Sequence, residues 1–275
     1  MTGKRLISWL FLGSQLLISA ETIFAAPPKS FEVSDVAASS SCEGKYIILK
    51  MDDLRVKENN NLSQSWLAYI SKVKELNIKS SMGLIVEEVT KGAAPFNTEL
   101  MSLHKDERFE VWHHGWDHKR RNLLPKKDNL GEFAGTPYEY QYDHLQKGIV
   151  YARDVLGIEF LTVGTPYNKS DETFVKVLHQ HPSLKVWLYC QDESFSGLCL
   201  KRGPSNHLED PIGRVSYTSF LTAYASSIHP YLVLQGHPDM WDKESFAQFE
   251  KVIGYLKRHK ACFVLPSEYY RIRKG

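Results

Sequence analysis

Residues 45–53 read KYIILKMDD, and this stretch decides the fold class. A short apolar run of this kind, stopped by two aspartates, predicts a strand that is buried on both faces. Such strands belong to parallel sheets covered by helices, and in those folds the functional groups gather where the strands end. The stretch therefore predicts an α/β fold with its chemistry at Asp52 and Asp53.

The same order continues along the chain, where short apolar runs alternate with amphipathic stretches. Further strands are expected over residues 81–86, 109–112, 160–163, 184–189, 231–234 and 262–265, and helices over residues 62–76, 138–156, 174–179 and 246–256. Seven or eight strand–helix units in one domain suit a distorted (β/α)7-type barrel, which is the fold that we expect. A doubly wound open sheet is the alternative.

The composition is that of a folded protein. Hydrophobic residues make up 43% of the 275 residues and charged residues 24%, which argues against a disordered chain. The formal net charge of +2 gives no indication of a nucleic-acid or membrane partner. Nothing in the sequence indicates an oligomeric state.

Residues 1–26 are expected to be a signal peptide. Lys4 and Arg5 precede an apolar stretch, and small residues at Ala20 or at positions 25–26 offer cleavage sites. A membrane anchor is the alternative, but the apolar stretch is shorter than the ~20 residues of a spanning helix. We therefore expect a secreted or periplasmic protein without stable membrane insertion after cleavage. Residues 27–43 are then a linker or N-terminal arm, and residues 44–275 a single domain.

Four cysteines follow the expected signal peptide, and their spacing matches no zinc-ribbon pattern. In an oxidising compartment they allow two disulfides. Cys190–Cys199 would close a short loop, and Cys42–Cys262 would form if the strands beside them are neighbours. Four buried thiols are the alternative.

Two histidines, His114 and His118, follow the strand expected at residues 109–112. On a helical turn their spacing would place both imidazoles on one face, close enough to share a metal ion. With Asp53 as the third ligand the set suits Zn²⁺, or else Co²⁺ or Ni²⁺, and leaves positions open for water and substrate.

Acid–base groups lie at other expected strand ends. If Asp53 binds a metal, Asp52 is placed to take a proton from bound water. His237 follows the strand at residues 231–234 and can protonate a leaving group. Residues 164–167 form a turn whose backbone N–H groups can stabilise an oxyanion. Taken alone, each of these features also fits an ordinary strand-ending turn.

Aromatic residues lie near the same strand ends, and aromatic faces stack on sugar rings. We expect one or two of five to line a groove: Trp112, Trp116, Tyr167, Trp187 and Trp241.

In this order the motifs resemble the polysaccharide deacetylases, the NodB-homology or carbohydrate esterase 4 family. The resemblance is carried by residues 51–53 (MDD), 110–118 (EVWHHGWDH), 165–167 (TPY) and 234–237 (LQGH). It spans about residues 45 to 265 and implies a distorted (β/α) barrel with a catalytic domain over residues 44–275. It also implies hydrolysis of N-acetyl, or O-acetyl, groups on an exported or cell-surface polysaccharide, with metal-bound water as the nucleophile.

The resemblance assigns three metal ligands and three catalytic groups. The implied ligands of a divalent metal, most often zinc, are Asp53, His114 and His118. The implied base is Asp52, the implied general acid His237, and the implied oxyanion donor the backbone N–H of Tyr167.

The chain departs from the family pattern at several positions, which indicates a divergent member. The family usually steadies its base with an arginine two residues before the proline of the third motif, where this chain has Gly164. Arg55 and Arg214 are the candidates to replace that arginine. The aspartate that usually orients the acid histidine has no clear counterpart, and Asp192 is the candidate. Gly115 stands where a small hydroxyl residue is common.

Three functions follow from these residues. The first is a metal-dependent deacetylase acting on a polysaccharide or oligosaccharide. The second is a catalytically weak carbohydrate-binding protein on the same scaffold. The third is a metal-dependent amidase acting on non-peptide C–N bonds. The complete set of ligands and acid–base groups favours the first, and the missing arginine favours the second.

Overall fold

The chain is described by a computed structural model over residues 42–57, 60–91, 94–120, 131–203 and 207–274. The expected signal peptide and most of the expected N-terminal arm lie outside these residues. Across the described ranges, no helix is long and apolar enough to cross a membrane.

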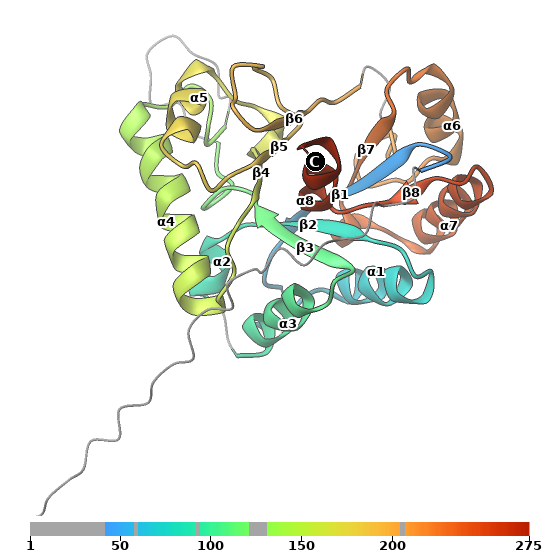
Figure 1. Ribbon diagram of the computed structural model, residues 1–275. Helices are drawn as coiled ribbons and strands as arrows, with labels where there is room; N and C mark the ends of the chain where they lie inside the picture. The colour runs from blue at the N-terminus through green and yellow to red at the C-terminus, as the bar shows by residue number, and fades with distance from the viewer. Residues whose placement is uncertain (1–41, 58–59, 92–93, 121–130, 204–206, 275) are drawn as a thin grey trace, which may run out of the picture. The chain divides into compact units, whose positions relative to one another are not determined.

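The fold is a parallel sheet that curls into an open barrel (Figure 1). Its described strands are β1 (Tyr46–Leu54), β2 (Ser80–Leu84), β3 (Phe109–His113), β4 (Thr162–Gly164), β5 (Val186–Leu188), β6 (Leu198–Leu200), β7 (Tyr231–Gly236) and β8 (Cys262–Phe263). The order across the sheet is β6-β5-β4-β3-β2-β1-β7, and β8 pairs with the first residues of β1. The order runs in one direction with parallel pairing, whereas a doubly wound sheet reverses. The distorted (β/α)7-type barrel is therefore confirmed.

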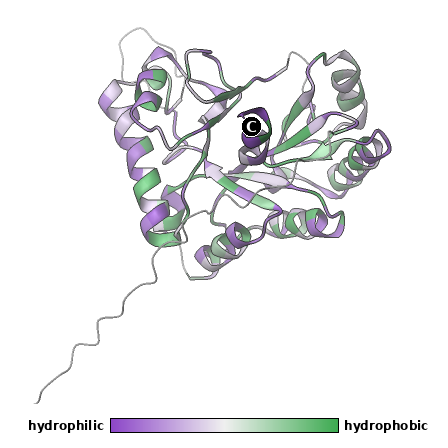
Figure 2. Cartoon of the chain, in the orientation of Figure 1, coloured by the Kyte–Doolittle hydropathy of each residue, from purple (hydrophilic) through white to green (hydrophobic). Residues whose placement is uncertain are grey.

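Helices surround the sheet. Those described are α1 (Gln64–Glu75), α2 (Glu87–Thr90), α3 (Ala94–Lys105), α4 (Tyr138–Leu156), α5 (Glu172–His179), α6 (Tyr217–Ser226), α7 (Lys243–Arg258) and α8 (Pro266–Lys274), with short 3-10 turns η2 (Pro166–Asn168) and η3 (Pro238–Met240). Figure 2 shows apolar and polar residues interspersed along the outer helices, as expected when one face of each helix packs on the sheet. Helices α2, α3, α6 and α8 were not expected from the sequence.

The apolar core has two layers because side chains alternate along each strand. On β1, Ile47, Leu49 and Met51 pack in the layer beneath the helices, whereas Ile48 packs inside the barrel with Trp112 and Tyr189. The same period of two turns Lys50 and Asp52 to the inside of the barrel.

Helix α8 packs at the amino-terminal end of the barrel, and Figure 1 shows it end-on among the strands. The Tyr269 ring centroid lies 5.2 Å from that of Tyr46 and 5.4 Å from that of Tyr231, which begin β1 and β7. The backbone N–H of Ser267 donates to Glu110 near the start of β3 (2.9 Å). Helix α8 therefore covers the end of the barrel where the strands begin.

Both expected disulfides are present, so the interpretation as four thiols is wrong. Cys42 is bonded to Cys262 at the start of β8, and Cys190 is bonded to Cys199 on β6. No free cysteine occurs in the described part of the chain.

Candidate metal centre

Strained backbone conformations gather where the strands end. Asp53 near the end of β1 has φ 67°, His118 after β3 has φ 54°, Tyr167 after β4 has φ 58° and Tyr189 after β5 has φ 55°. Non-glycine residues pay ~1–3 kcal/mol for such conformations, which cluster at functional sites where the surrounding structure holds them. The strain marks the same strand ends that the sequence motifs mark.

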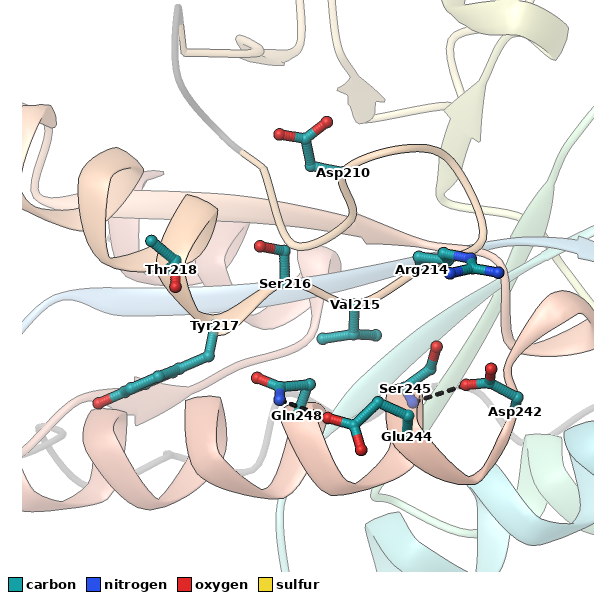
Figure 3. A pocket seen from close by; sticks show the side chains of 10 residues that line it. All are labelled: Asp210, Arg214, Val215, Ser216, Tyr217, Thr218, Asp242, Glu244, Ser245 and Gln248. Carbon is teal, nitrogen blue, oxygen red and sulfur yellow. Dashed lines mark hydrogen bonds between the residues drawn. The ribbon is translucent and has the colours of Figure 1, made fainter.

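A pocket between the beginnings of α6 and α7 is separate from these motifs (Figure 3). Asp210, Arg214 and Asp242 are among the residues that line it. Asp242 caps α7 by accepting a hydrogen bond from the N–H of Ser245 (2.8 Å). None of the expected ligands or acid–base groups lines this pocket, and we assign it no role in the chemistry.

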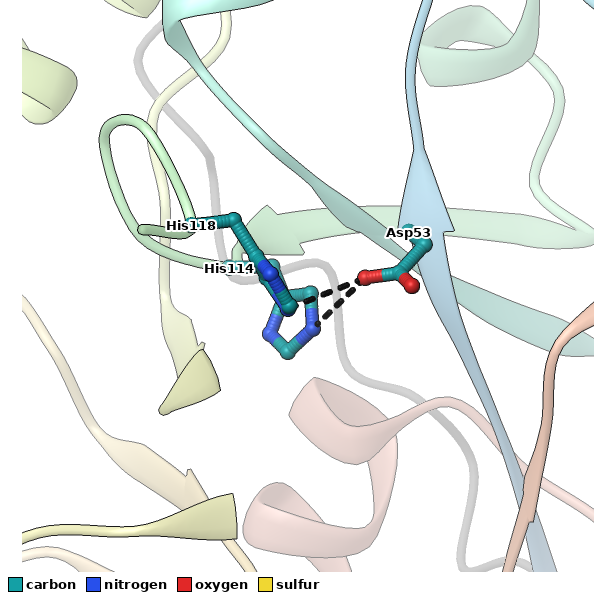
Figure 4. Close-up of side chains that lie close together, drawn as sticks. All are labelled: Asp53, His114 and His118. Carbon is teal, nitrogen blue, oxygen red and sulfur yellow. Dashed lines mark ion pairs between the residues drawn. The ribbon is translucent and has the colours of Figure 1, made fainter. Parts of the chain in front are cut away.

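The structure brings the three expected metal ligands together. Oδ1 of Asp53 lies 3.1 Å from Nε2 of His118 and 3.4 Å from Nε2 of His114. Figure 4 shows the carboxylate, from the end of β1, facing both imidazoles. Tetrahedral zinc with Zn–N bonds of ~2.0–2.1 Å separates neighbouring ligand atoms by roughly 3.3 Å. The two oxygen–nitrogen distances match this spacing, and all three ligand atoms lie within 4.8 Å of one another.

The hydrogen bonds around these atoms fit a divalent cation. Nδ1 of His114 lies 2.8 Å from the carbonyl oxygen of Gly164, so this nitrogen carries the proton and Nε2 keeps its lone pair. Within the described residues, His114 Nε2 and Asp53 Oδ1 are buried and have no hydrogen-bond partner. Buried polar atoms are normally satisfied, and a cation at this point would satisfy both.

The expectation of a helical turn at His114 and His118 is wrong. Residues 114–118 form a loop after β3, turned by Gly115 at φ 84°. The carboxylate of Glu132 holds this loop, because it accepts hydrogen bonds from the N–H groups of Trp116 (2.6 Å) and His118 (2.9 Å). The two imidazoles meet through these tertiary contacts and not through helical periodicity.

Glu132 also belongs to a second group of possible ligands, with Asp117 and His144. Its Oε1 lies 2.9 Å from Nδ1 of His144, and Asp117 contacts Lys119 (3.3 Å). The hydrogen bonds of Glu132 are already used to hold the histidine loop, so we interpret this group as the support of the first site.

The base expected at Asp52 is buried and firmly held. Lys50 Nζ lies 2.6 Å from each of its carboxylate oxygens, and Gln235 Nε2 donates to Oδ2 (2.6 Å). Burial alone would raise the pKa of this carboxyl, but the charge of the neighbouring Lys50 and its hydrogen bond to the carboxylate counter burial, and the pKa is lowered. Asp52 is therefore ionised, as a base must be.

Neither arginine proposed to steady Asp52 does so. Arg55 pairs with Asp53 instead, at 2.9 Å from its Oδ2. Arg214 lies on the pocket of Figure 3, where its charge acts on Asp242. The cation beside Asp52 is Lys50, which the sequence reasoning missed although the two-residue spacing on one strand was a usable signal.

The acid expected at His237 is oriented by Glu209 and not by Asp192. Oε2 of Glu209 lies 2.7 Å from Nδ1 of His237, and its Oε1 accepts the N–H of the same residue (2.6 Å) and the indole N–H of Trp241 (2.5 Å). Asp192 instead accepts the N–H of Ser194. Glu209 lies in a loop distant in sequence, and no local pattern pointed to it.

Burial alone would lower the pKa of His237. The hydrogen bond to Glu209 and the charges of Asp52 and Asp53 outweigh burial and raise this pKa above its ordinary value. A histidine of this kind is protonated over a wider pH range, which suits a general acid.

Tyr167 is the aromatic residue of the expected five that stays partly exposed. Its ring centroid lies 4.5 Å from that of His118, and its hydroxyl donates to the His118 carbonyl (2.7 Å). The other four are buried: Trp112, Trp116, Trp187 and Trp241. The expectation that one or two of the five line a groove therefore depends on Tyr167 and stays a prediction.

No protein-family model matches the sequence, and no curated protein matches it significantly. Solved structures match by fold. A mutant of a CE4 family pseudoenzyme from Bacillus anthracis, with restored enzymatic activity, has 15% identity and a TM-score of 0.55, covering 80% of this chain and 65% of that one. This chain thus spans just under two thirds of the length of that structure.

Two further structures match over most of both chains. A family 4 acetyl xylan esterase from Clostridium thermocellum, in complex with a cobalt ion, has 12% identity and a TM-score of 0.54, covering 83% of this chain and 92% of that one. A peptidoglycan N-acetylglucosamine deacetylase has 17% identity and a TM-score of 0.57, covering 84% and 90%. The resemblance of the motifs is thus confirmed at the level of the fold, and the chain has the fold of the carbohydrate esterase 4 structures.

Proposed function

We propose that this chain is a metal-dependent deacetylase, a divergent member of the carbohydrate esterase 4 family that hydrolyses N-acetyl or O-acetyl groups on a polysaccharide or oligosaccharide. The observation that carries the proposal is the meeting of Asp53, His114 and His118 beside a buried, ionised Asp52. The fold shared with acetyl xylan esterase and deacetylase structures supports the same reaction class.

Asp53, His114 and His118 are the residues that would hold the cation, and their carboxylate and imidazole donors suit zinc first, then cobalt or nickel. When bound, such a cation supplies Lewis-acid chemistry by lowering the pKa of water and polarising an acetyl carbonyl. The neighbouring structure in complex with a cobalt ion is consistent with this donor set.

The remaining groups supply proton transfer and charge stabilisation. Asp52, held by Lys50 and Gln235, accepts the proton of the attacking water. Nδ1 of His237 donates a hydrogen bond to Glu209, so Nε2 is left to protonate the departing amine or hydroxyl. The backbone N–H of Tyr167 donates to the developing oxyanion.

The experiment that tests the proposal is acetate release by zinc-loaded protein from a panel of glycans. Acetylated chito-oligosaccharides test N-deacetylation, and acetylated xylan tests O-deacetylation. Asp52→Asn is the matched control because it removes the base and retains the metal ligands. We expect release by the wild-type protein well above that of the variant. Equal release by both proteins on every glycan would refute the proposal.

A carbohydrate-binding protein with weak turnover is the second candidate. It is favoured by the pseudoenzymes among the structural neighbours and by the missing arginine at Gly164. Glycan binding by the zinc-loaded protein without acetate release would support it. Release of ammonia or an amine from small non-peptide amides, with none from glycans, would support an amidase.

We also propose that residues 1–26 are a signal peptide and residues 27–43 an arm, and that the catalytic domain over residues 44–275 acts outside the cytoplasm. The two disulfides support this location, because disulfides persist in oxidising compartments. N-terminal sequencing of the exported protein tests the cleavage site.

A further inference from the structure

Lys50 is a fully buried lysine whose ammonium group is directed at one carboxylate. Its Nζ lies 2.6 Å from both carboxylate oxygens of Asp52 and 3.1 Å from Oδ1 of Asn168. An ammonium has three N–H donors, and these three acceptors match them. The side chain therefore has a defined position and not the mobility of a surface lysine.

The barrel interior fixes this position from several sides. Nζ of Lys50 lies 5.1 Å from the ring centroid of Trp112 and 4.9 Å from that of Tyr189, so two aromatic rings flank the cation. A buried ammonium is costly unless it is paired and hydrogen-bonded. Asp52 supplies the pairing, and the aromatic rings exclude water.

Asp52 is held on its other side as well. Gln235 on β7 donates to Oδ2 of Asp52 (2.6 Å) and accepts a hydrogen bond from Nδ2 of Asn168 (2.9 Å). Lys50, Asp52, Gln235 and Asn168 thus form a closed ring of hydrogen bonds contributed by β1, β7 and η2. The ring fixes the plane of the carboxylate.

The position that lacks an arginine has no room for one. A Cβ on Gly164 would lie 2.6 Å from the Trp112 ring, which also covers Gly83 on β2. Trp112 therefore occupies the space that a side chain on β4 would enter. A cation for Asp52 must then come from another strand.

We propose that Lys50 is the positioning residue that aligns the catalytic base Asp52, in place of the arginine absent at Gly164. This inference rests on the proposed function, because it assigns Lys50 a part in the same reaction. The alternative is an ion pair that only stabilises the barrel, which would affect unfolding and not the rate of folded enzyme.

The test compares Lys50→Met and Lys50→Arg in the full chain loaded with zinc. Lys45→Met is the matched control, because Lys45 precedes β1 and binds the carbonyls of Ser227 and His229 instead (both 2.8 Å). Each variant is measured for zinc stoichiometry, unfolding temperature, kcat and KM on the acetylated glycan that the wild type cleaves.

We expect Lys50→Met to keep zinc and KM while kcat falls roughly 10- to 100-fold, the loss typical when the partner of a site group is removed. Lys50→Arg should recover part of kcat, and Lys45→Met should keep all of it. An unchanged kcat in folded, zinc-loaded Lys50→Met would overturn the inference.

A double variant keeps the inference testable if Lys50→Met alone does not fold. Lys50→Met combined with Asp52→Asn removes both charges, and it should be no slower than Asp52→Asn alone, because Lys50 acts through Asp52. A double variant that is slower than Asp52→Asn would overturn the inference.

If the wild type cleaves no glycan, the proposed function fails, and crystal structures of the zinc-loaded wild type and Lys50→Met decide the inference about Lys50. The plane of the Asp52 carboxylate should differ between the two proteins, because Lys50 binds both of its oxygens. An unchanged carboxylate plane would overturn the inference.

Discussion

Replacing Glu209 with glutamine tests how the proposed acid is tuned. The Glu209 carboxylate is almost fully buried and meets His237 twice, at the backbone N–H (2.6 Å) and at Nδ1 (2.7 Å). Glutamine keeps the shape of the side chain and removes its charge. The substitution therefore removes the charge of Glu209 and one of its two acceptor oxygens, and both losses disfavour the protonated imidazole.

The direction of the expected pKa change follows from the charges that face His237. Burial lowers its pKa, whereas the hydrogen bond to Glu209 and the charges of Asp52 and Asp53 raise it, with a net rise. An opposite charge at this range shifts a pKa by ~1–3 units, so the pKa of His237 should fall by about that amount in the variant. The acid works when protonated, so activity is present below this pKa and lost as pH rises through it. The alkaline limb should therefore move to lower pH by ~1–3 units.

The assay is the pH profile of kcat/KM for zinc-loaded Glu209→Gln, together with the titration of the His237 ring by nitrogen-15 NMR. Glu244→Gln is the matched control, because Glu244 is an exposed residue on α7 that contacts Gln248. The control variant should keep the alkaline limb of its pH profile at the wild-type pH. An alkaline limb and a ring titration that both stay at the wild-type pH in Glu209→Gln would refute the reasoning.

Four further changes have defined outcomes. Replacing both histidine ligands with alanine should abolish stoichiometric zinc in elemental analysis of the purified protein. Gly164→Ala places a Cβ 2.6 Å from the Trp112 ring, and urea denaturation should show a loss of about 1–3 kcal/mol in the free energy of unfolding. Removing the Cys42–Cys262 disulfide, whose residues are 220 apart, should lower thermal stability by an amount equivalent to at most about 5 kcal/mol. Removing the Cys190–Cys199 disulfide, whose residues are 9 apart, should lower thermal stability by about half of that amount.

For each of these predictions, one experimental result would contradict it. Full zinc occupancy in the histidine variant would reject the metal site. Gly254→Ala is the control for Gly164→Ala, because its Cβ meets only the end of Arg258 at 3.4 Å and alanine favours the helix by up to ~1 kcal/mol. Equal effects of the two glycine changes would contradict the packing argument. Equal losses for the two disulfides would contradict the loop-length argument.

The sequence by itself determined the parallel barrel and part of its site. A strand buried on both faces appears in the sequence as a continuous apolar run. Strands β1 and β3 begin and end close to the ends of such runs. Asp53, His114 and His118 were recognisable as candidates because each follows such a run. The period of two along β1 also places Lys50 and Asp52 on one face of the strand.

Only the tertiary structure decided how these residues work together. The four-residue spacing of His114 and His118 suggested a helix, but the segment is a loop held by Glu132, which lies 14 residues beyond His118. Glu209 reaches His237 from 28 residues away, and Gln235 reaches Asp52 from 183 away. Periodicity reports the contacts of near neighbours in the chain, whereas these contacts exist only once the barrel has brought separate strand ends together. The opening stretch, residues 45–53, thus specified a strand and its two aspartates, and the folded barrel brought them to their partners.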